Sequence, residues 1–397
     1  MNLEALDKQY VLQTYARDYT NFTHGIGSKL YDDKGVEYID FASGIGVSSV
    51  GHANKHLTQA ICEQAQKIIH ISNLQVIEPQ AKLAKKIVEL CGYDAKVFFA
   101  NSGAEANEGA IKMARKYGTV NFDTKKYKII SLGHSFHGRT LSALTATAQE
   151  SFHPDTFAPY PKGFSYVANI DDIYDAIDEE TIAVIIELTQ GEGGVMNFDK
   201  HKVQELAKFL QEKKLLFIVD EIQTGIYRTG SFLESNNYEV TPDIVTVAKG
   251  LGGGVPIGAI ITRHKEILSA GEHGTTFGGN YLSTAAGLAV LDILSELKQG
   301  GQLQETIEYF DKKLDHIIAQ YSDLFIKKTG LGLMRGIVAK DDAIKNAVIK
   351  NAMKQRVIVL KSGRNTVRFL PSLTITKEEI DEGFARFEKA LSETRVS

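Results

Sequence analysis

Cysteine is scarce in this chain, because Cys62 and Cys91 are the only two among its 397 residues. Two thiols at this separation do not form the paired spacing of a metal site. They are typical of a protein kept in a reducing compartment. Residues 1–8 also lack the apolar stretch of a secretory signal. We therefore expect a cytoplasmic protein with no bound metal.

Long apolar runs and a strong excess of one charge are absent as well. No run approaches the roughly 20 residues that a bilayer-spanning helix needs. The 45 basic and 49 acidic residues give a net charge of −4, which does not favour a nucleic acid or membrane partner. Only 7 prolines stand against 35 glycines, which indicates tight turns and close approach of the backbone to a ligand. The expected partners are small molecules.

What the sequence does contain is an alternation of short apolar strands and helical patterns between about residues 55 and 280. Strands are predicted at 96–100, 127–131, 182–187, 215–219, 244–247 and 258–262, and helices at 55–70, 78–91, 104–117, 199–213 and 281–297. Such alternation predicts an α/β fold with a mostly parallel sheet flanked by helices. The unbroken apolar runs 182–186 and 215–219 are typical of strands that are buried on both faces.

The two ends of the chain differ from this central part. After about residue 300 the pattern changes to helix, strands and a final amphipathic helix at 377–392, and residues 29–41 read as a hairpin around an Asp-Lys-Gly turn. With 397 residues, the chain has room for two domains. We predict a large domain at 46–290 and a smaller α+β domain built from 1–45 and 291–397.

A lysine follows one of the predicted strands. Lys249 comes directly after an apolar run and is followed by a glycine-rich loop at 250–254. An isolated lysine at a strand end is usually solvated. Burial would lower its pKa towards neutrality and make the amine a nucleophile and a base, which suits a Schiff base with a carbonyl cofactor.

A carboxylate stands at the end of a neighbouring predicted strand. Asp220 closes the run 215–219. In pyridoxal 5′-phosphate (PLP) enzymes, a carboxylate in such a position can bond the protonated ring nitrogen and keep the cofactor an electron sink. Because ligands of open α/β sheets bind at strand ends, Asp220 and Lys249 together predict a PLP site.

A third strand end offers a cradle for phosphate. Ser102 and Glu105 form the S-x-x-E pattern of a capping box, so a helix begins there. Its first N–H groups can bind an anion, and Gly103 lets the backbone come close. Taken alone, this motif favours a helix cap without a ligand, because many helices carry such caps.

These motifs, with three others, carry a resemblance to a known family. The chain resembles the class III, fold-type I PLP-dependent aminotransferases over nearly its whole length. The matching segments follow the family's order and spacing and are 101–107, 135–140, 190–194, 219–225, 248–250 and 273–280.

The resemblance implies a set of cofactor contacts. It implies that Gly103 and Ala104 bind the PLP phosphate through backbone N–H groups, that Phe136 stacks on the ring, and that Gln223 approaches the ring's 3′-oxygen. Ala104 departs from the threonine that many members carry, so only its backbone contact remains. Thr276 would reach the phosphate of the other subunit's PLP, which implies a homodimer with shared active sites.

Substrate contacts are implied by the resemblance as well. Arg139 and Arg368 match arginines that grip substrate carboxylates, a task that suits the planar guanidinium; which arginine takes which carboxylate stays open. Glu192 would stand near cofactor and substrate, pair with Arg368, and swing away when a dicarboxylate binds. Thr275, beside Thr276, would also line the site, although a plain loop fits these residues too.

Two further residues bear on the choice of substrate. Ile45 stands where ornithine-type members carry a tyrosine, and an apolar residue offers no partner to a free α-amine. Tyr15 could line the same pocket. His52, His134, His137 and His273 lie near the motifs, but their spacing fits no metal site and indicates structural roles.

The resemblance therefore predicts an aminotransferase of the acetylornithine type. It would convert N-acetyl-L-ornithine and 2-oxoglutarate into N-acetyl-L-glutamate 5-semialdehyde and L-glutamate, in arginine biosynthesis. Ornithine, succinyl-diaminopimelate and 4-aminobutyrate are alternative amino donors. A nucleotide-binding oxidoreductase is disfavoured, because the glycines at 250–254 follow a late strand and open no convincing helix. A non-catalytic scaffold would not be expected to retain both Lys249 and Asp220.

Overall fold

The computed structural model describes residues 2–396, so residues 1 and 397 of the predicted small domain lie outside the described residues. A seven-stranded sheet forms the centre of the molecule. Its strands, in spatial order, are β4 (Lys96–Ala100), β12 (Gly258–Thr262), β11 (Ile244–Val247), β10 (Leu216–Asp220), β7 (Thr181–Ile186), β5 (Lys128–Leu132) and β6 (Phe164–Val167). All neighbours are parallel except those that β12 makes with β11 and β4. The predicted mostly parallel sheet is confirmed, and only β6 was not foreseen.

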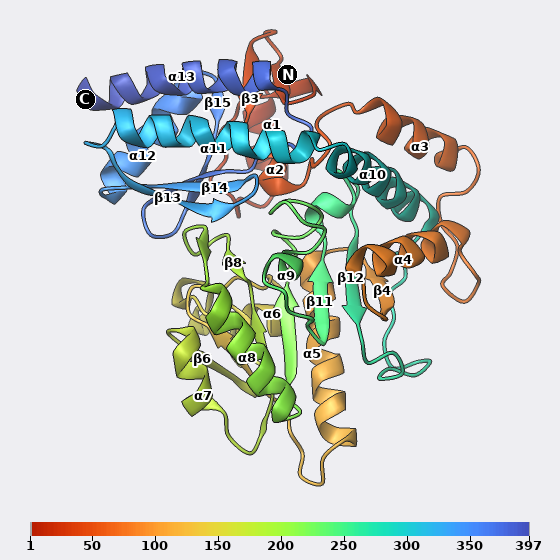
Figure 1. The fold of residues 1–397 in the computed structure, drawn as a ribbon. Helices are drawn as coiled ribbons and strands as arrows, with labels where there is room; N and C mark the ends of the chain where they lie inside the picture. The colour runs from red at the N-terminus through yellow and green to blue at the C-terminus, as the bar shows by residue number, and fades with distance from the viewer. Residues whose placement is uncertain (1, 397) are drawn as a thin grey trace.

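Helices cover both faces of this sheet (Figure 1). Helix α5 (Gly103–Val120) packs on one face and α8 (Lys200–Glu212) on the other. Along β10, Ile218 joins the apolar core that includes α5, whereas the next residue, Val219, joins the core that includes α8. Successive side chains of a strand point to opposite faces, so an unbroken apolar strand serves both layers.

Three more helices pack together beside the β4 edge (Figure 1). They are α3 (Lys55–Ala65), α4 (Glu78–Cys91) and α10 (Tyr281–Gln299). The prediction for α4 matches the structure, but the prediction of a helix over 55–70 runs too far. Helix α3 ends at Ala65, and the apolar Ile69 that extended the pattern is 52% exposed.

The N-terminal and C-terminal parts share one sheet. It contains β1 (Phe22–Ile26), β2 (Lys29–Asp32), β3 (Glu37–Asp40) and β15 (Val357–Ile358), with β15 parallel to β3. The predicted hairpin is present as the antiparallel pair β2–β3. We propose the division into a large domain at 46–290 and a small domain at 1–45 and 291–397, which the β3–β15 pairing supports.

The rest of the C-terminal part is a second sheet with three long helices (Figure 1). The sheet has the order β13 (Phe325–Leu331), β14 (Met334–Ala339), β17 (Thr366–Phe369) and β16 (Leu360–Ser362). The helices are α11 (Gln302–Gln320), α12 (Asp342–Lys354) and α13 (Lys377–Val396).

Several short elements were not predicted, because they are too short to show a period. They are α1 (Leu3–Tyr10), α2 (Ser43–Gly46), α6 (Leu141–Ala146), α7 (Ile173–Ala176), α9 (Glu234–Asn237), β8 (Thr189–Gln190) and β9 (Met196–Asn197), with single 3₁₀ turns at 150–152, 155–157, 170–172 and 249–251. Across residues 2–396, no helix is both long and apolar enough to cross a bilayer.

Candidate active site

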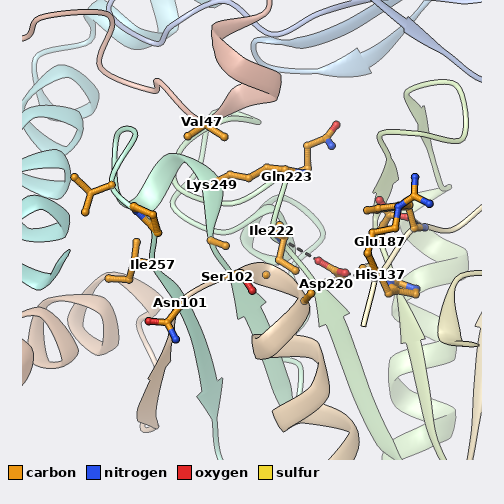
Figure 2. Close-up of a pocket in the computed structure, with 18 of the residues that line it drawn as sticks. Val47, Asn101, Ser102, His137, Glu187, Asp220, Ile222, Gln223, Lys249 and Ile257 are labelled. Carbon is orange, nitrogen blue, oxygen red and sulfur yellow. Dashed lines mark hydrogen bonds and ion pairs between the residues drawn. The ribbon is translucent and has the colours of Figure 1, made fainter. Parts of the chain in front are cut away.

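A cavity of about 410 Å³ opens where strands β10 and β11 end (Figure 2). This is the sheet edge at which ligands of α/β folds bind. Its walls are formed by Val47, Asn101, Ser102, Gly103, Ala104, Phe136, His137, Gly138, Arg139, Glu187, Asp220, Ile222, Gln223, Ala248, Lys249, Gly254, Val255, Pro256 and Ile257. The three strand-end motifs singled out in the sequence therefore meet in one place.

Lys249 points into this cavity from the turn after β11 (Figure 2). Its backbone has φ +41°, a left-handed conformation that lysine rarely adopts and that often marks functional sites. The residue is partly open to the cavity, but burial by the surrounding protein lowers the pKa of its amine; the charge of Glu192 opposes this shift and that of Arg368 adds to it. Lowering the pKa increases the fraction of neutral, reactive amine.

Asp220 lies on another wall of the cavity, at the end of β10, and is 3% exposed. Its Oδ2 accepts a hydrogen bond from Asn107 Nδ2 at 2.7 Å and lies 2.8 Å from His137 Nδ1. Its Oδ1 accepts from the backbone N–H of Ile222 at 3.0 Å. The carboxylate is therefore fixed in position and presented to the cavity.

The residues around Asp220 form a buried polar chain that the sequence did not reveal. Asn107, which bonds Asp220, also accepts a hydrogen bond from Thr246 Oγ1 at 2.8 Å. The sequence indicated only a structural role for His137, whereas the structure places it in the cavity wall against the carboxylate. No pattern in the sequence connects these residues, because a helix, two strands and a loop bring them together.

A second carboxyl group, Glu187, also reaches the cavity and was missed (Figure 2). It follows β7 directly, so the reasoning applied to Asp220 could have found it. It accepts from the backbone N–H of Phe136 at 2.9 Å and of Gly191 at 3.4 Å. Burial raises the pKa of Glu187 to about 7, and the charge of Asp220 adds to this rise.

The start of α5 forms the floor of the cavity. Ser102 accepts a hydrogen bond from the backbone N–H of Glu105 at 3.2 Å, as the capping box predicts. The return bond differs from the prediction, because the Glu105 carboxylate accepts from the N–H of Asn101 at 2.7 Å instead of that of Ser102. A Cβ at Gly103 would lie 2.7 Å from Ile222 Cδ1, so the close approach of the helix start to Ile222 requires glycine here.

The two candidate arginines occupy different environments. Arg139 lines the cavity, is exposed, and lies with its guanidinium 4.0 Å from the centre of the Phe152 ring. Arg368, on β17, is 2% exposed and donates through Nη1 to Glu192 Oε1 at 2.7 Å and to Gln223 Oε1 at 3.0 Å. Because Gln223 lines the cavity, Arg368 lies directly behind its wall.

The structure does not bring every predicted site residue to this cavity. Thr275 and Thr276 line a neighbouring hollow of about 710 Å³, and Thr275 Oγ1 accepts from Asn101 Nδ2 at 2.9 Å. Tyr15 is 73% exposed and Ile45 is 43% exposed, and neither belongs to the cavity lining found among residues 2–396. The predicted contact of these two residues with the pocket is therefore not made within the single chain.

Ile45 sits in a left-handed turn at the rim of the cavity. Residues 43–46 have φ values of +41°, +64°, +66° and +74°. Asp40 Oδ1 holds the turn by accepting from the N–H groups of Ala42 at 2.9 Å and Ser43 at 2.8 Å. The turn delivers Val47 to the cavity wall. A β-branched residue in this conformation is strained.

The class-III aminotransferase family model matches residues 13–391. The chain belongs to the class-III aminotransferases. This aminotransferase is 56% identical over 389 residues to acetylornithine aminotransferase from Wolinella succinogenes, covering 98% of this chain and 99% of that protein. It is 43% identical over 400 residues to acetylornithine aminotransferase from Caldanaerobacter subterraneus subsp. tengcongensis, covering 98% and 99% respectively.

Solved structures of aminotransferases share the fold. The ornithine aminotransferase from Toxoplasma gondii ME49 superposes with a TM-score of 0.93 at 30% identity, covering 99% of this chain and 95% of that one. N-acetylornithine aminotransferase from Stenotrophomonas maltophilia K279a gives a TM-score of 0.83 at 31% identity, with 99% of each chain covered. The predicted fold-type I architecture is confirmed.

The cavity of this class-III aminotransferase suits PLP. It combines a lysine with lowered pKa, a buried carboxylate, an aromatic side chain and the N–H groups at the start of a long helix. These are the groups required for the aldehyde, the ring nitrogen, the ring face and the phosphate of PLP. Its size falls within the range of about 300–1,000 Å³ that is usual for small-molecule sites.

Proposed function

We propose that this aminotransferase transfers the ω-amino group of N-acetyl-L-ornithine to 2-oxoglutarate, with PLP as cofactor. The observation that carries the proposal is the meeting of Lys249 and Asp220 in one cavity. The acetylornithine aminotransferases at 43–56% identity support this choice of substrate. A soluble cytoplasmic enzyme of arginine biosynthesis is the cellular role that we infer.

In this proposal the cavity residues hold the cofactor at four points. Gly103 and Ala104 bind the phosphate through backbone N–H groups at the start of α5, and Phe136 lies against the ring. Asp220 accepts the hydrogen bond of the ring nitrogen, while Gln223 approaches the 3′-oxygen. When bound, PLP supplies the electron sink for the carbanion that forms at the substrate carbon.

Lys249 then acts as the proton carrier. With PLP bound, its Nζ would remove the proton from the substrate carbon that bears the amine and would deliver it to the cofactor. A lowered pKa suits this task, because a general base works best when its pKa is near the working pH. The buried contacts of Asp220 keep its carboxylate aligned through the step.

Arg139 and Arg368 bind the substrate carboxylates in this scheme. Arg368 is paired with Glu192 at 2.7 Å, so a substrate carboxylate reaches it only when the Glu192 side chain moves away. Glu192 is about one-third exposed and can do so. With Glu192 bonded to Arg368, the site accepts a donor without a distal carboxylate. With Glu192 moved away, the same site accepts 2-oxoglutarate.

Steady-state kinetics will test the choice of amino donor. We expect ping-pong kinetics with 2-oxoglutarate and a kcat/KM for N-acetylornithine roughly ten- to a hundredfold above those for ornithine and 4-aminobutyrate. The reason is that a free α-ammonium would lack a partner beside Ile45, a cost of about 1–3 kcal/mol. Ile45→Tyr should narrow the gap by supplying a hydroxyl, whereas Ile45→Val should preserve it. A preference of the unmodified enzyme for free ornithine would contradict the substrate while leaving the aminotransferase assignment in place.

We further propose that the active unit is a homodimer, with Thr276 acting on the partner's cofactor. Thr276 is exposed and faces a hollow outside the Lys249 cavity, as a residue serving a second subunit would. Apolar side chains near this hollow are also uncovered, with Leu74 89%, Val76 87% and Phe277 59% exposed. Exposed apolar clusters of this kind are typical of subunit interfaces.

Mixed dimers of Lys249→Ala and Thr276→Ala subunits will test this arrangement. If Thr276 acts across the interface, one site carries both lesions and the other carries neither, so about half of the normal activity should return. The Thr276→Ala homodimer, measured alongside, must be impaired for the comparison to count. Activity no higher than that of the two parent homodimers would show that each subunit uses its own Thr276.

A further inference from the structure

The loop that carries Glu192 is held by a side chain far away in sequence. Ser362, on β16, is 6% exposed. Its Oγ donates towards Gly191 O at 2.8 Å, lies 3.1 Å from Glu192 O, and accepts from the N–H of Gly194 at 2.9 Å. One hydroxyl therefore contacts the backbone of three of the four residues of the 191–194 loop.

Two further hydrogen bonds hold the 191–194 loop to the β16–β17 hairpin. The N–H of Gly363 donates to Glu192 O at 2.9 Å, and Thr366 Oγ1 donates to Gly194 O at 3.2 Å. The loop also packs closely on backbone, because a Cβ at Gly193 would fall 2.9 Å from His134 O. The backbone of the loop is thus fixed, and Glu192 can leave Arg368 only by rotating its side chain.

Arg368 lies on the same β16–β17 hairpin as Ser362 and Thr366, which hold the loop. Strands β16 and β17 pair so that Ser362 lies opposite Thr366 and Leu360 lies opposite Arg368. The hairpin that holds the Glu192 backbone therefore also carries the arginine to which Glu192 is bonded. Loosening the loop would move the carboxylate of Glu192 relative to the guanidinium of Arg368.

We propose that Ser362 is a positioning residue that keeps Glu192 over Arg368 and so sets how readily Arg368 accepts the carboxylate of a dicarboxylic substrate. This rests on the proposed role of Arg368 in carboxylate binding. Glu192 competes with the incoming carboxylate, so its fixed position weakens dicarboxylate binding and protects the selectivity for the amino donor.

The test uses glutarate, a five-carbon dicarboxylate without a reactive group, bound to the holoenzyme and followed by calorimetry. Ser362→Ala should bind glutarate about three- to tenfold more tightly. The reason is that losing one hydrogen bond to the loop should weaken the competing Glu192–Arg368 pair by a similar factor. Ser362→Ala should also lower the KM for 2-oxoglutarate more than that for the amino donor. Ser372→Ala is the matched control. Ser372 is a buried serine whose Oγ lies 3.0 Å from Ser28 Oγ and makes no bond to the loop, so this variant should change neither the glutarate affinity nor the KM for 2-oxoglutarate.

A double-mutant cycle shows whether Ser362 acts through Glu192. Glu192→Ala alone should tighten glutarate binding, and adding Ser362→Ala should then have no further effect. An equal gain in the Glu192→Ala background, unchanged or weaker affinity in Ser362→Ala, or no detectable glutarate binding by any variant would each overturn the proposal. If the alanine variant does not fold, Ser362→Cys, with its weak donor, carries the same expectation. Because glutarate binding does not depend on the amino donor, an error in the proposed substrate would leave this result intact.

Discussion

Lys249→Ala should abolish turnover, with a loss of several orders of magnitude, while the protein still folds and binds PLP noncovalently. The cavity keeps the other proposed cofactor contacts, namely the start of α5, Phe136 and Asp220. What disappears is the amine with lowered pKa, which no other residue of the described cavity lining supplies. Single-turnover absorbance spectra in the visible range will measure the loss for each half of the reaction.

Chemical labelling gives an independent measurement for the same residue. Borohydride reduction of the holoenzyme, followed by peptide mapping, should place the pyridoxyl label on Lys249. Lys345→Ala serves as the control, because Lys345 is also buried but lies in α12, away from the cavity. A label on any other lysine would remove the basis of the assignment.

Asp220→Asn should retain the cofactor and lose on the order of 10²-fold or more in kcat. A neutral amide cannot keep the ring nitrogen protonated, and removing one charge-assisted contact at a developing charge costs several kcal/mol of barrier. Asn preserves the shape of the side chain but can accept only one of the two bonds from Asn107 and the Ile222 N–H, so some loss of stability should accompany the loss of rate.

The corresponding control is Asp243→Asn at the opposite end of the sheet. Asp243 bonds the N–H of Phe217 at 3.0 Å and is remote from the cavity, so it should affect stability more than kcat. Near-normal turnover in Asp220→Asn would show that another group holds the ring nitrogen.

The sequence predicted the centre of the fold because its signals are local. The patterns of unbroken apolar strands and of capped helices each lie within a short stretch of consecutive residues. Strands β11 and β12 match their predicted bounds. The same logic located Lys249, Asp220 and Gly103, since each follows a strand and strand ends converge in an α/β sheet. Glu187 follows β7 in the same way, so the same local signal marks it.

What the sequence could not supply are contacts between distant elements. The chain from Thr246 through Asn107 to Asp220 joins two strands and a helix, and Ser362 reaches its loop across some 170 residues. Such contacts depend on the final packing of the domains, and no local pattern encodes them. Tyr15 is exposed in the single chain, so its place in the pocket stays a prediction that depends on contacts outside this chain.

The left-handed turn at 43–46 has a consequence for engineering this enzyme. Isoleucine at φ +66° carries a conformational cost of about 1–2 kcal/mol that glycine or asparagine would avoid. A redesign guided by thermostability alone would therefore accept glycine in place of Ile45. It would gain folding free energy and discard the side chain that we propose discriminates between amino donors. At this position, robustness and selectivity are opposing design goals.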